Sequence, residues 1–185
     1  MVEAKTNMDD DLLIVVDEND TFLRHESKAR CHDGDGILHR AFSVLVFDDS
    51  NRLLIQQRSP SKRLWPGFWS NSCCSHPHKG EEVEQAAARR LREELGLSTP
   101  LKVLYKFIYH ARFGDAGSEH EMCSVLVGRS GGEVRAAPDE IAAWRFVDAV
   151  ELESEMATNP AAFTPWFKTE WQRIRTDHRT DIESL

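Results

Sequence analysis

The chain has 185 residues, with 31 acidic side chains against 23 lysines and arginines and a net charge of −8. This length suits about one domain with a substantial core, and the acidic balance argues against a general nucleic-acid binder, which needs excess positive charge. No apolar run is long enough to cross a bilayer and the N-terminus is polar and acidic, so we expect a cytoplasmic protein with no membrane association. Four cysteines, two of them adjacent at 73 and 74, predict free thiols rather than a disulfide framework.

Residues 1–10 are predicted to be a loose tail, followed by one domain over 11–180. Apolar and alternating runs predict strands at 12–16, 21–23, 39–47, 52–58, 101–112, 121–127 and 144–147. A C-terminal helix is expected at 163–174. This order predicts an α+β domain with a mixed or mainly antiparallel sheet flanked by helices.

Residues 65–97 predict a loop followed by a helix that builds a site. The loop mixes tryptophan, cysteine and histidine with glycine, proline and small polar residues, which suits a shaped site better than a core strand. Glutamates at 81, 82 and 84 are expected in the first helical turn, and Gly96 ends the helix. The apolar stripe recurs every four residues, at Val83, Ala87, Leu91 and Leu95. Arg90 and Glu94 share a neighbouring face, so a cation and a carboxylate can point into the same cleft.

Histidines and glutamates in separate segments form a candidate metal set: His32, His39, His76, Glu119 and Glu121. Glu119 and Glu121 alternate, so both carboxylates project from one face of a strand. Such a mixed nitrogen and oxygen site admits zinc, manganese or magnesium. The alternative is that these are ordinary polar residues of loops and strand ends.

Cys74 is a candidate nucleophile or acid/base group, because a thiol near histidine and a metal has a movable pKa; the alternative is a small buried hydrophobe. A basic set surrounds the loop and indicates an anionic ligand: Lys28, Arg58, Lys62, Arg63, Arg89 and Arg90. Solvated surface charge is the alternative for Arg63 and Arg89, and it also stays open for Arg58 and Lys62. The tryptophans at 65, 69 and 166 read individually as packing residues.

Part of this segment resembles the Nudix signature, through Ser75-x5-Glu81-x7-Arg89-Arg90-Leu91-x-Glu93-Glu94-x-Gly96-Leu97. Serine replaces the first glycine of that signature, and Arg90 replaces a glutamate that holds magnesium in Nudix hydrolases. Both departures point to one branch, and from about 32 to 166 the chain resembles type I isopentenyl-diphosphate isomerases. The matching motifs are His39-Arg40-Ala41-Phe42, Trp65-Pro66-Gly67, Asn71-Ser72, Cys74-x-His76-Pro77, Glu119-x-Glu121 and Phe163-x-Pro165-Trp166.

The resemblance implies conversion of a small molecule, isopentenyl diphosphate, to dimethylallyl diphosphate by a monomer or weak dimer. It implies Cys74 and Glu121 as opposed acid/base groups, with Tyr109 bonded to Glu121 and Trp166 facing a carbocation. Its diphosphate-facing cations are Lys28, Arg58, Lys62 and Arg90. Its metal ligands are His32, His39, His76, Glu119 and Glu121 for a divalent ion (Mn2+, Mg2+ or Zn2+), and Glu94 for Mg2+ at the substrate diphosphate. Cys73 matches a position that varies within the family.

Two other functions remain open on the sequence. A Nudix hydrolase would share the fold and the magnesium site, although Arg90 and the pair of Cys74 with His76 argue against it. A zinc-binding module could use Cys73, Cys74, His76 and His78, but adjacent cysteines suit a compact tetrahedral site badly.

Overall fold

The computed structural model describes residues 12–185. Its strands are β1 (Leu12–Val16), β2 (Phe22–Ser27), β3 (His39–Phe47), β4 (Leu53–Arg58), β5 (Trp69–Ser70), β6 (Cys73–Ser75), β7 (Lys102–Phe113), β8 (Gly117–Arg129) and β9 (Ile141–Val147). Its α-helices are α1 (Lys28–His32), α2 (Val83–Leu95), α3 (Ala149–Thr158), α4 (Pro165–Asp177) and α5 (Arg179–Glu183), with a short 3-10 turn η1 (Pro160–Ala162). Residues 1–10 lie outside the described part, so the predicted tail and the domain limits stay predictions.

The strands form one mixed sheet, as predicted, around the parallel pair of β3 and β8. The other strand pairs are antiparallel, including the long β7–β8 hairpin and the pair of β3 with β6. The parallel register sets His39 beside Glu121, and the hairpin register sets Tyr109 opposite Glu121. Side chains of directly paired residues lie on the same face, so the topology itself gathers these three groups.

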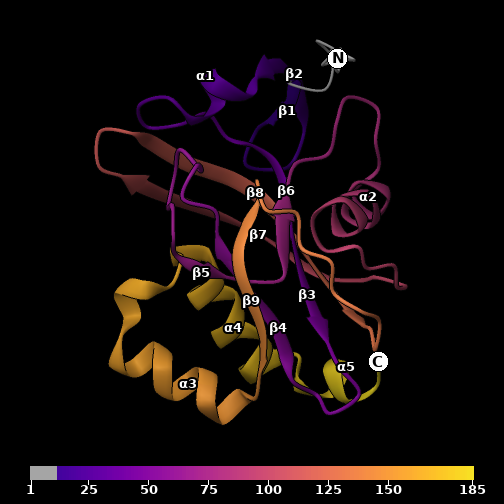
Figure 1. The fold of residues 1–185 in the computed structure, drawn as a ribbon. Coiled ribbons are helices and arrows are strands. Elements are labelled where there is room, and N and C mark those ends of the chain that lie inside the picture. The colour runs from indigo at the N-terminus through magenta and orange to yellow at the C-terminus, as the bar shows by residue number, and fades with distance from the viewer. Residues whose placement is uncertain (1–11) are drawn as a thin grey trace, which may run out of the picture.

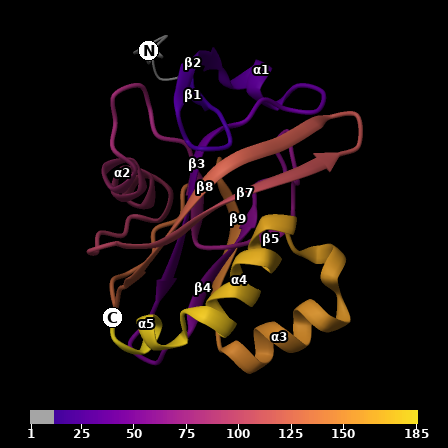
Figure 2. The same cartoon turned by 180° about the vertical axis from the view of Figure 1, so that it is seen from behind.

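Helices cover both faces of the sheet (Figures 1 and 2), with α2 on one side and α3 and α4 on the other. Beneath α2 lies a core that includes Leu91, Leu95 and Phe42. Under α3 and α4 lies a second core that includes Phe167, Trp171 and Leu45. Alternate residues of the central strands feed the two cores, which is why β3 is buried almost throughout.

The α2 helix follows the predicted pattern with a later start. Its first residue is Val83 with Glu82 as the N-cap, so Glu81 lies outside the first turn and instead accepts two hydrogen bonds from Arg89. Gly96 ends the helix in the left-handed conformation, at φ 68°, as predicted for a C-terminal glycine. The loop before α2 contains the short strands β5 and β6, which the sequence did not predict.

Among residues 12–185, no helix combines the length and the apolar character needed to span a bilayer.

Candidate active site

A cavity of about 490 Å³ opens at one end of the sheet, and almost every predicted site residue lines it. The lining includes Lys28, His32, Arg58, Lys62, Cys74, His76, Arg90, Tyr109, Glu119, Glu121 and Trp166. The remaining two, His39 and Glu94, are buried directly behind it, in contact with Glu121 and Arg90 respectively. The structure therefore brings together residues from nearly the whole length of the chain.

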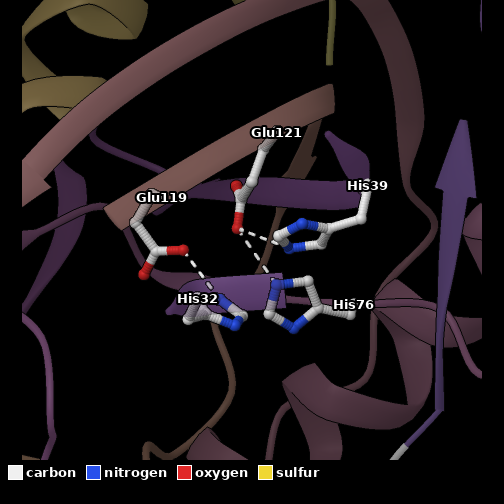
Figure 3. A group of neighbouring side chains, drawn as sticks. All are labelled: His32, His39, His76, Glu119 and Glu121. Carbon is white, nitrogen blue, oxygen red and sulfur yellow. Dashed lines mark hydrogen bonds and ion pairs between the residues drawn. The ribbon is translucent and has the colours of Figure 1, made fainter. Parts of the chain in front are cut away.

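The predicted metal set is a compact cluster (Figure 3): His32, His39, His76, Glu119 and Glu121 each present one ligand atom, all within 4.8 Å of one another. Nε2 of His32 lies 2.9 Å from Oε2 of Glu119, and Nε2 of His76 lies 3.0 Å from Oε1 of Glu121. Ligands bonded at about 2.0–2.3 Å to one ion have separations of this size. The cluster can therefore hold a divalent metal ion.

Backbone carbonyls orient two of the three imidazoles. Nδ1 of His32 lies 2.7 Å from the Lys28 carbonyl oxygen, and Nδ1 of His39 lies 2.7 Å from that of Ile37. Because a carbonyl only accepts, each ring donates its Nδ1–H and turns the Nε2 lone pair toward the cluster. Nε2 of His39 is buried without a hydrogen-bond partner, which is costly unless a metal ion binds it.

The protonation of the histidines also fits a metal site. Burial, reinforced by the neighbouring His32, lowers the pKa of His39 to about 4. Burial and the His39 ring hold the pKa of His76 well below its ordinary value. Both rings are therefore neutral at pH 7, which is the form that binds metal.

Glu121 and Tyr109 form a buried pair beside the cluster. The Tyr109 hydroxyl donates to Oε2 of Glu121 at 2.5 Å, while Oε1 of the same carboxylate faces His76. Burial and the nearby Glu119 raise the pKa of Glu121 well above its ordinary value, against the effect of the Tyr109 hydrogen bond. Glu121 is thus a carboxyl group whose proton affinity depends on its partners, as an acid/base group requires.

The adjacent cysteines point in opposite directions, as alternation along β6 demands. Cys74 lines the cavity, where Arg58 Nη1 approaches its Sγ to 3.9 Å, and burial raises its thiol pKa to about 12. Cys73 is fully buried in the core beneath α2. Within residues 12–185 the metal cluster includes no cysteine, which removes the basis for the alternative zinc module.

The cations at the other end of the cavity are held by acidic and carbonyl groups. Arg90 binds Glu94 with Nη2 at 2.6 Å and Nε at 3.1 Å, so the predicted pair on α2 is formed. Arg58 donates to the carbonyl oxygens of Trp65 and Leu64. Sequence reasoning missed Glu140, which bridges Lys62 and Arg90 from the residue before β9. Only the acidic pair at 139 and 140 ahead of a strand could have drawn attention to it.

An aromatic wall closes the cavity beside Cys74 and Tyr109. Trp166 lies 5.8 Å from the Tyr109 ring and 5.2 Å, edge-on, from that of Trp65, between ring centroids. Its indole N–H donates to Asn71 Oδ1 at 3.2 Å, and Asn71 also donates to the Cys73 carbonyl at 2.8 Å. Asn71, quoted above only as part of a motif, therefore fixes the tryptophan and the cysteine strand together.

Comparison with known proteins places this arrangement in a class. The NUDIX domain family matches residues 37–167, so the fold and the site define a NUDIX-domain protein. Among curated proteins, the isopentenyl-diphosphate Delta-isomerase of Serratia proteamaculans is 44% identical over 160 residues, covering 86% of this chain and 89% of that protein. The protein of the same name from Burkholderia multivorans is 46% identical over 157 residues, covering 84% and 88%. The chain belongs to the isopentenyl-diphosphate Delta-isomerase family.

Solved structures confirm the fold independently. The DR0079 protein of Deinococcus radiodurans superposes with a TM-score of 0.71 at 22% identity, covering 88% of this chain and 98% of that one. A MutT protein from Methanosarcina mazei gives 0.61 at 16% identity, covering 75% and 93%. At these identities the likeness concerns the fold alone.

Proposed function

We propose that this protein interconverts isopentenyl diphosphate and dimethylallyl diphosphate by adding one proton to the substrate and removing another. The observation that carries the proposal is that one cavity contains a protonated thiol, a tunable carboxyl group, a metal-type cluster and four cations. A hydrolase needs no such thiol beside an aromatic wall. The family relationship supports the same reaction.

The double bond moves when the terminal alkene carbon gains a proton and the carbon on the other side of the resulting cation loses one. Cys74 and Glu121 are the two groups that exchange these protons, so one gives a proton while the other takes one. Their roles reverse for the back reaction, and the proton count of the substrate is unchanged. The Tyr109 hydrogen bond holds the Glu121 carboxyl in place during this exchange.

The intermediate cation needs protection from water and an electron-rich neighbour. Trp166 is buried, it lines the cavity, and the face of an indole ring attracts positive charge. Trp65, buried against it with φ at 47°, helps to close the same wall. A backbone strained in this way at a site is held there by the surrounding packing. The wall keeps the reacting carbons dry.

Two divalent ions complete the site in this proposal. The three histidines with Glu119 and Glu121 would hold Mn2+, Mg2+ or Zn2+, and Glu94 would meet Mg2+ at the substrate diphosphate. When bound, the first ion lowers the proton affinity of Glu121 and the second neutralises diphosphate charge. Lys28, Arg58, Lys62 and Arg90 would bind the remaining phosphate oxygens and so position the hydrocarbon tail between Cys74 and Glu121.

The test is proton NMR of isopentenyl diphosphate incubated with the protein and Mg2+ in D2O. We expect dimethylallyl signals and deuterium in the product, because the protons on the Cys74 thiol and the Glu121 carboxyl exchange with the D2O solvent. The Cys74→Ala variant should lose at least about 1,000-fold in turnover while keeping its fold, and Cys73→Ala should remain active. Free phosphate with an unmoved double bond would establish a hydrolase instead, and a fully active Cys74→Ala protein would refute the thiol's role.

A further inference from the structure

Glu140 lies between Lys62 and Arg90 and pairs with both of them. Its Oε2 pairs with Lys62 Nζ, and its Oε1 accepts from Arg90 Nη2 at 3.0 Å. One anionic group thus gives one oxygen to each of two cations, which is the pattern that a phosphate makes with a lysine and an arginine. We propose that the Glu140 carboxylate competes with the substrate diphosphate for Lys62 and Arg90. The diphosphate must displace it in order to bind, so Glu140 sets the affinity of the site for substrate and product.

The backbone fixes Glu140 at this junction. Its carbonyl oxygen accepts from the Ser59 amide at 2.9 Å, which ties it to the loop that contains Lys62. Its own amide donates to the Ala137 carbonyl at 3.0 Å, and the Ala137 amide donates to the Glu94 carbonyl on α2 at 2.8 Å. These bonds fix the backbone of Glu140 relative to both cation-bearing segments, while its side chain stays free to change rotamer and release the cations.

Carboxylates occupy most of the hydrogen-bond donors of Arg90. Its Nε and Nη2 donate to Glu94, Nη2 also donates to Glu140, and Nη1 donates to Glu93 at 2.9 Å. A guanidinium has five N–H donors, so few of them are available to a ligand until one of these carboxylates moves away. By contrast, no ion pair within residues 12–185 joins Lys28 or Arg58 to a carboxylate. Glu140 therefore competes with an anionic ligand at two of the four cations, Lys62 and Arg90, and leaves Lys28 and Arg58 available to it.

The proposed reaction gives this competition a purpose, and the inference rests on that proposed function. Substrate and product carry the same diphosphate, so the four cations bind both equally. Such uniform binding lowers KM without raising kcat, and it slows product release. When the product dissociates, the Glu140 carboxylate takes the place of the product's diphosphate on Lys62 and Arg90. This competition weakens the binding of substrate and product alike and speeds product release. The negative charge of Glu140 also reduces the mutual repulsion of Lys62 and Arg90, which lets the two cations lie close together.

The test compares binding of inorganic pyrophosphate, with Mg2+, by calorimetry to the wild type and to Glu140→Gln. The amide keeps the shape and the backbone bonds but removes the competing charge, so we expect the dissociation constant to fall about fivefold to tenfold. Glu133→Gln is the matched control, because Glu133 lies in the same connection but, within residues 12–185, pairs only with the exposed Arg135. This substitution should leave pyrophosphate binding unchanged. The melting temperature of each variant reports on folding.

Steady-state kinetics separate this role from a structural one. For Glu140→Gln, KM should fall with the dissociation constant while kcat does not rise. In a Lys62→Met background the same substitution should tighten pyrophosphate less, because one of its two cations is gone. Unchanged or weaker binding in Glu140→Gln, or the full gain persisting without Lys62, would overturn the inference. A wild-type protein that neither binds magnesium pyrophosphate nor moves the double bond would instead overturn the proposed function.

Discussion

Glu170 is a buried carboxyl group to which the proposed chemistry gives no task. It is fully buried on α4, where Oε1 lies 3.9 Å from Cys123 Sγ and Oε2 has no hydrogen-bond partner. Burial raises its pKa to about 7, although hydrogen bonds with Ser43 and Cys123 act in the opposite direction. The group is therefore protonated in the folded protein at a pH where it is ionised in the unfolded chain.

This difference fixes the sign of a pH effect. Folding stability should fall as pH rises from about 4.5 toward and through about 7, because the unfolded chain loses the proton first. Glu170→Gln removes that cost, so it should stabilise the protein at pH 8 by up to about 3 kcal/mol and have little effect at pH 4.5. Urea unfolding at the two pH values measures this. Glu84→Gln, at an exposed position on α2, should show no such contrast, and an equal effect of Glu170→Gln at both pH values would contradict the argument.

The sequence alone identifies functional residues when their spacing along the chain or their place in a family motif marks them. The five residues of the candidate metal set lie together, and Cys74 and Tyr109 line the same cavity. Glu140 and Glu170 escaped because their importance arises from tertiary contacts. Glu140 lies 50 positions from the Arg90 it binds, and Glu170 reads as an ordinary polar residue of an amphipathic helix until α4 is packed onto β3 and β8.

At the scale of elements, strong periodicity was the reliable signal. The predicted strand at 39–47 and the body of α2 match the structure, because each buries a long, regular set of apolar side chains. Helix α3 was not predicted, since Leu152 is its only buried residue and its pattern is correspondingly weak. Strands β5 and β6 are two and three residues long, too short to show alternation. The strand predicted at 121–127 begins earlier, because β8 already starts at Gly117.

The absence of a side chain at Gly117 allows the end of α1 to lie directly against β8. A Cβ added at Gly117 would lie 2.1 Å from the His32 carbonyl oxygen, and its φ of 137° is also unfavourable for other residues. Gly117→Ala must therefore push the end of α1 away and displace His32, a member of the candidate metal set. We expect the affinity for Mn2+, measured by calorimetry on metal-depleted protein, to fall about 10- to 100-fold, as for a lost orienting contact.

Gly114 provides the matched control for this substitution. It also has a positive φ, 54°, but a Cβ there meets nothing within 4 Å. Gly114→Ala should therefore cost about 1–2 kcal/mol of stability from backbone strain and leave Mn2+ affinity unchanged. Equal losses of affinity in the two variants would show that strain in the hairpin, rather than contact with His32, governs the site.

At the scale of the whole molecule, the metal cluster joins segments that are far apart in the chain. Its candidate ligands come from α1, the start of β3, the residue after β6, and β8, so an ion bound there would link the N-terminal hairpin region to the central sheet. An ion that binds only the folded state stabilises it by about 2.7 kcal/mol at 100 times its dissociation constant. Chelation should accordingly lower the melting temperature, and Mn2+ should restore it; an unchanged melting temperature would mean that the cluster holds no structural ion.

The metal-free protein should then reveal the buried histidines in its pH dependence. His39 has a pKa of about 4 in the fold against about 6.5 when unfolded, so between these values the unfolded chain binds the extra proton. Stability is therefore complete above about pH 6.5 and decreases as pH falls to about 4, by about 3 kcal/mol for this one group. His76 adds to the decrease in the same direction. Urea unfolding of chelated protein should show this slope, and His39→Gln should reduce it. With a saturating metal ion the loss should become steeper, because protons must also displace the ion. If the unfolding free energy changed with pH equally in wild type and His39→Gln, the His39 ring would already be solvated. The cluster would then not be a closed, dry site. Both the metal affinity and the proposed proton transfers depend on such a site.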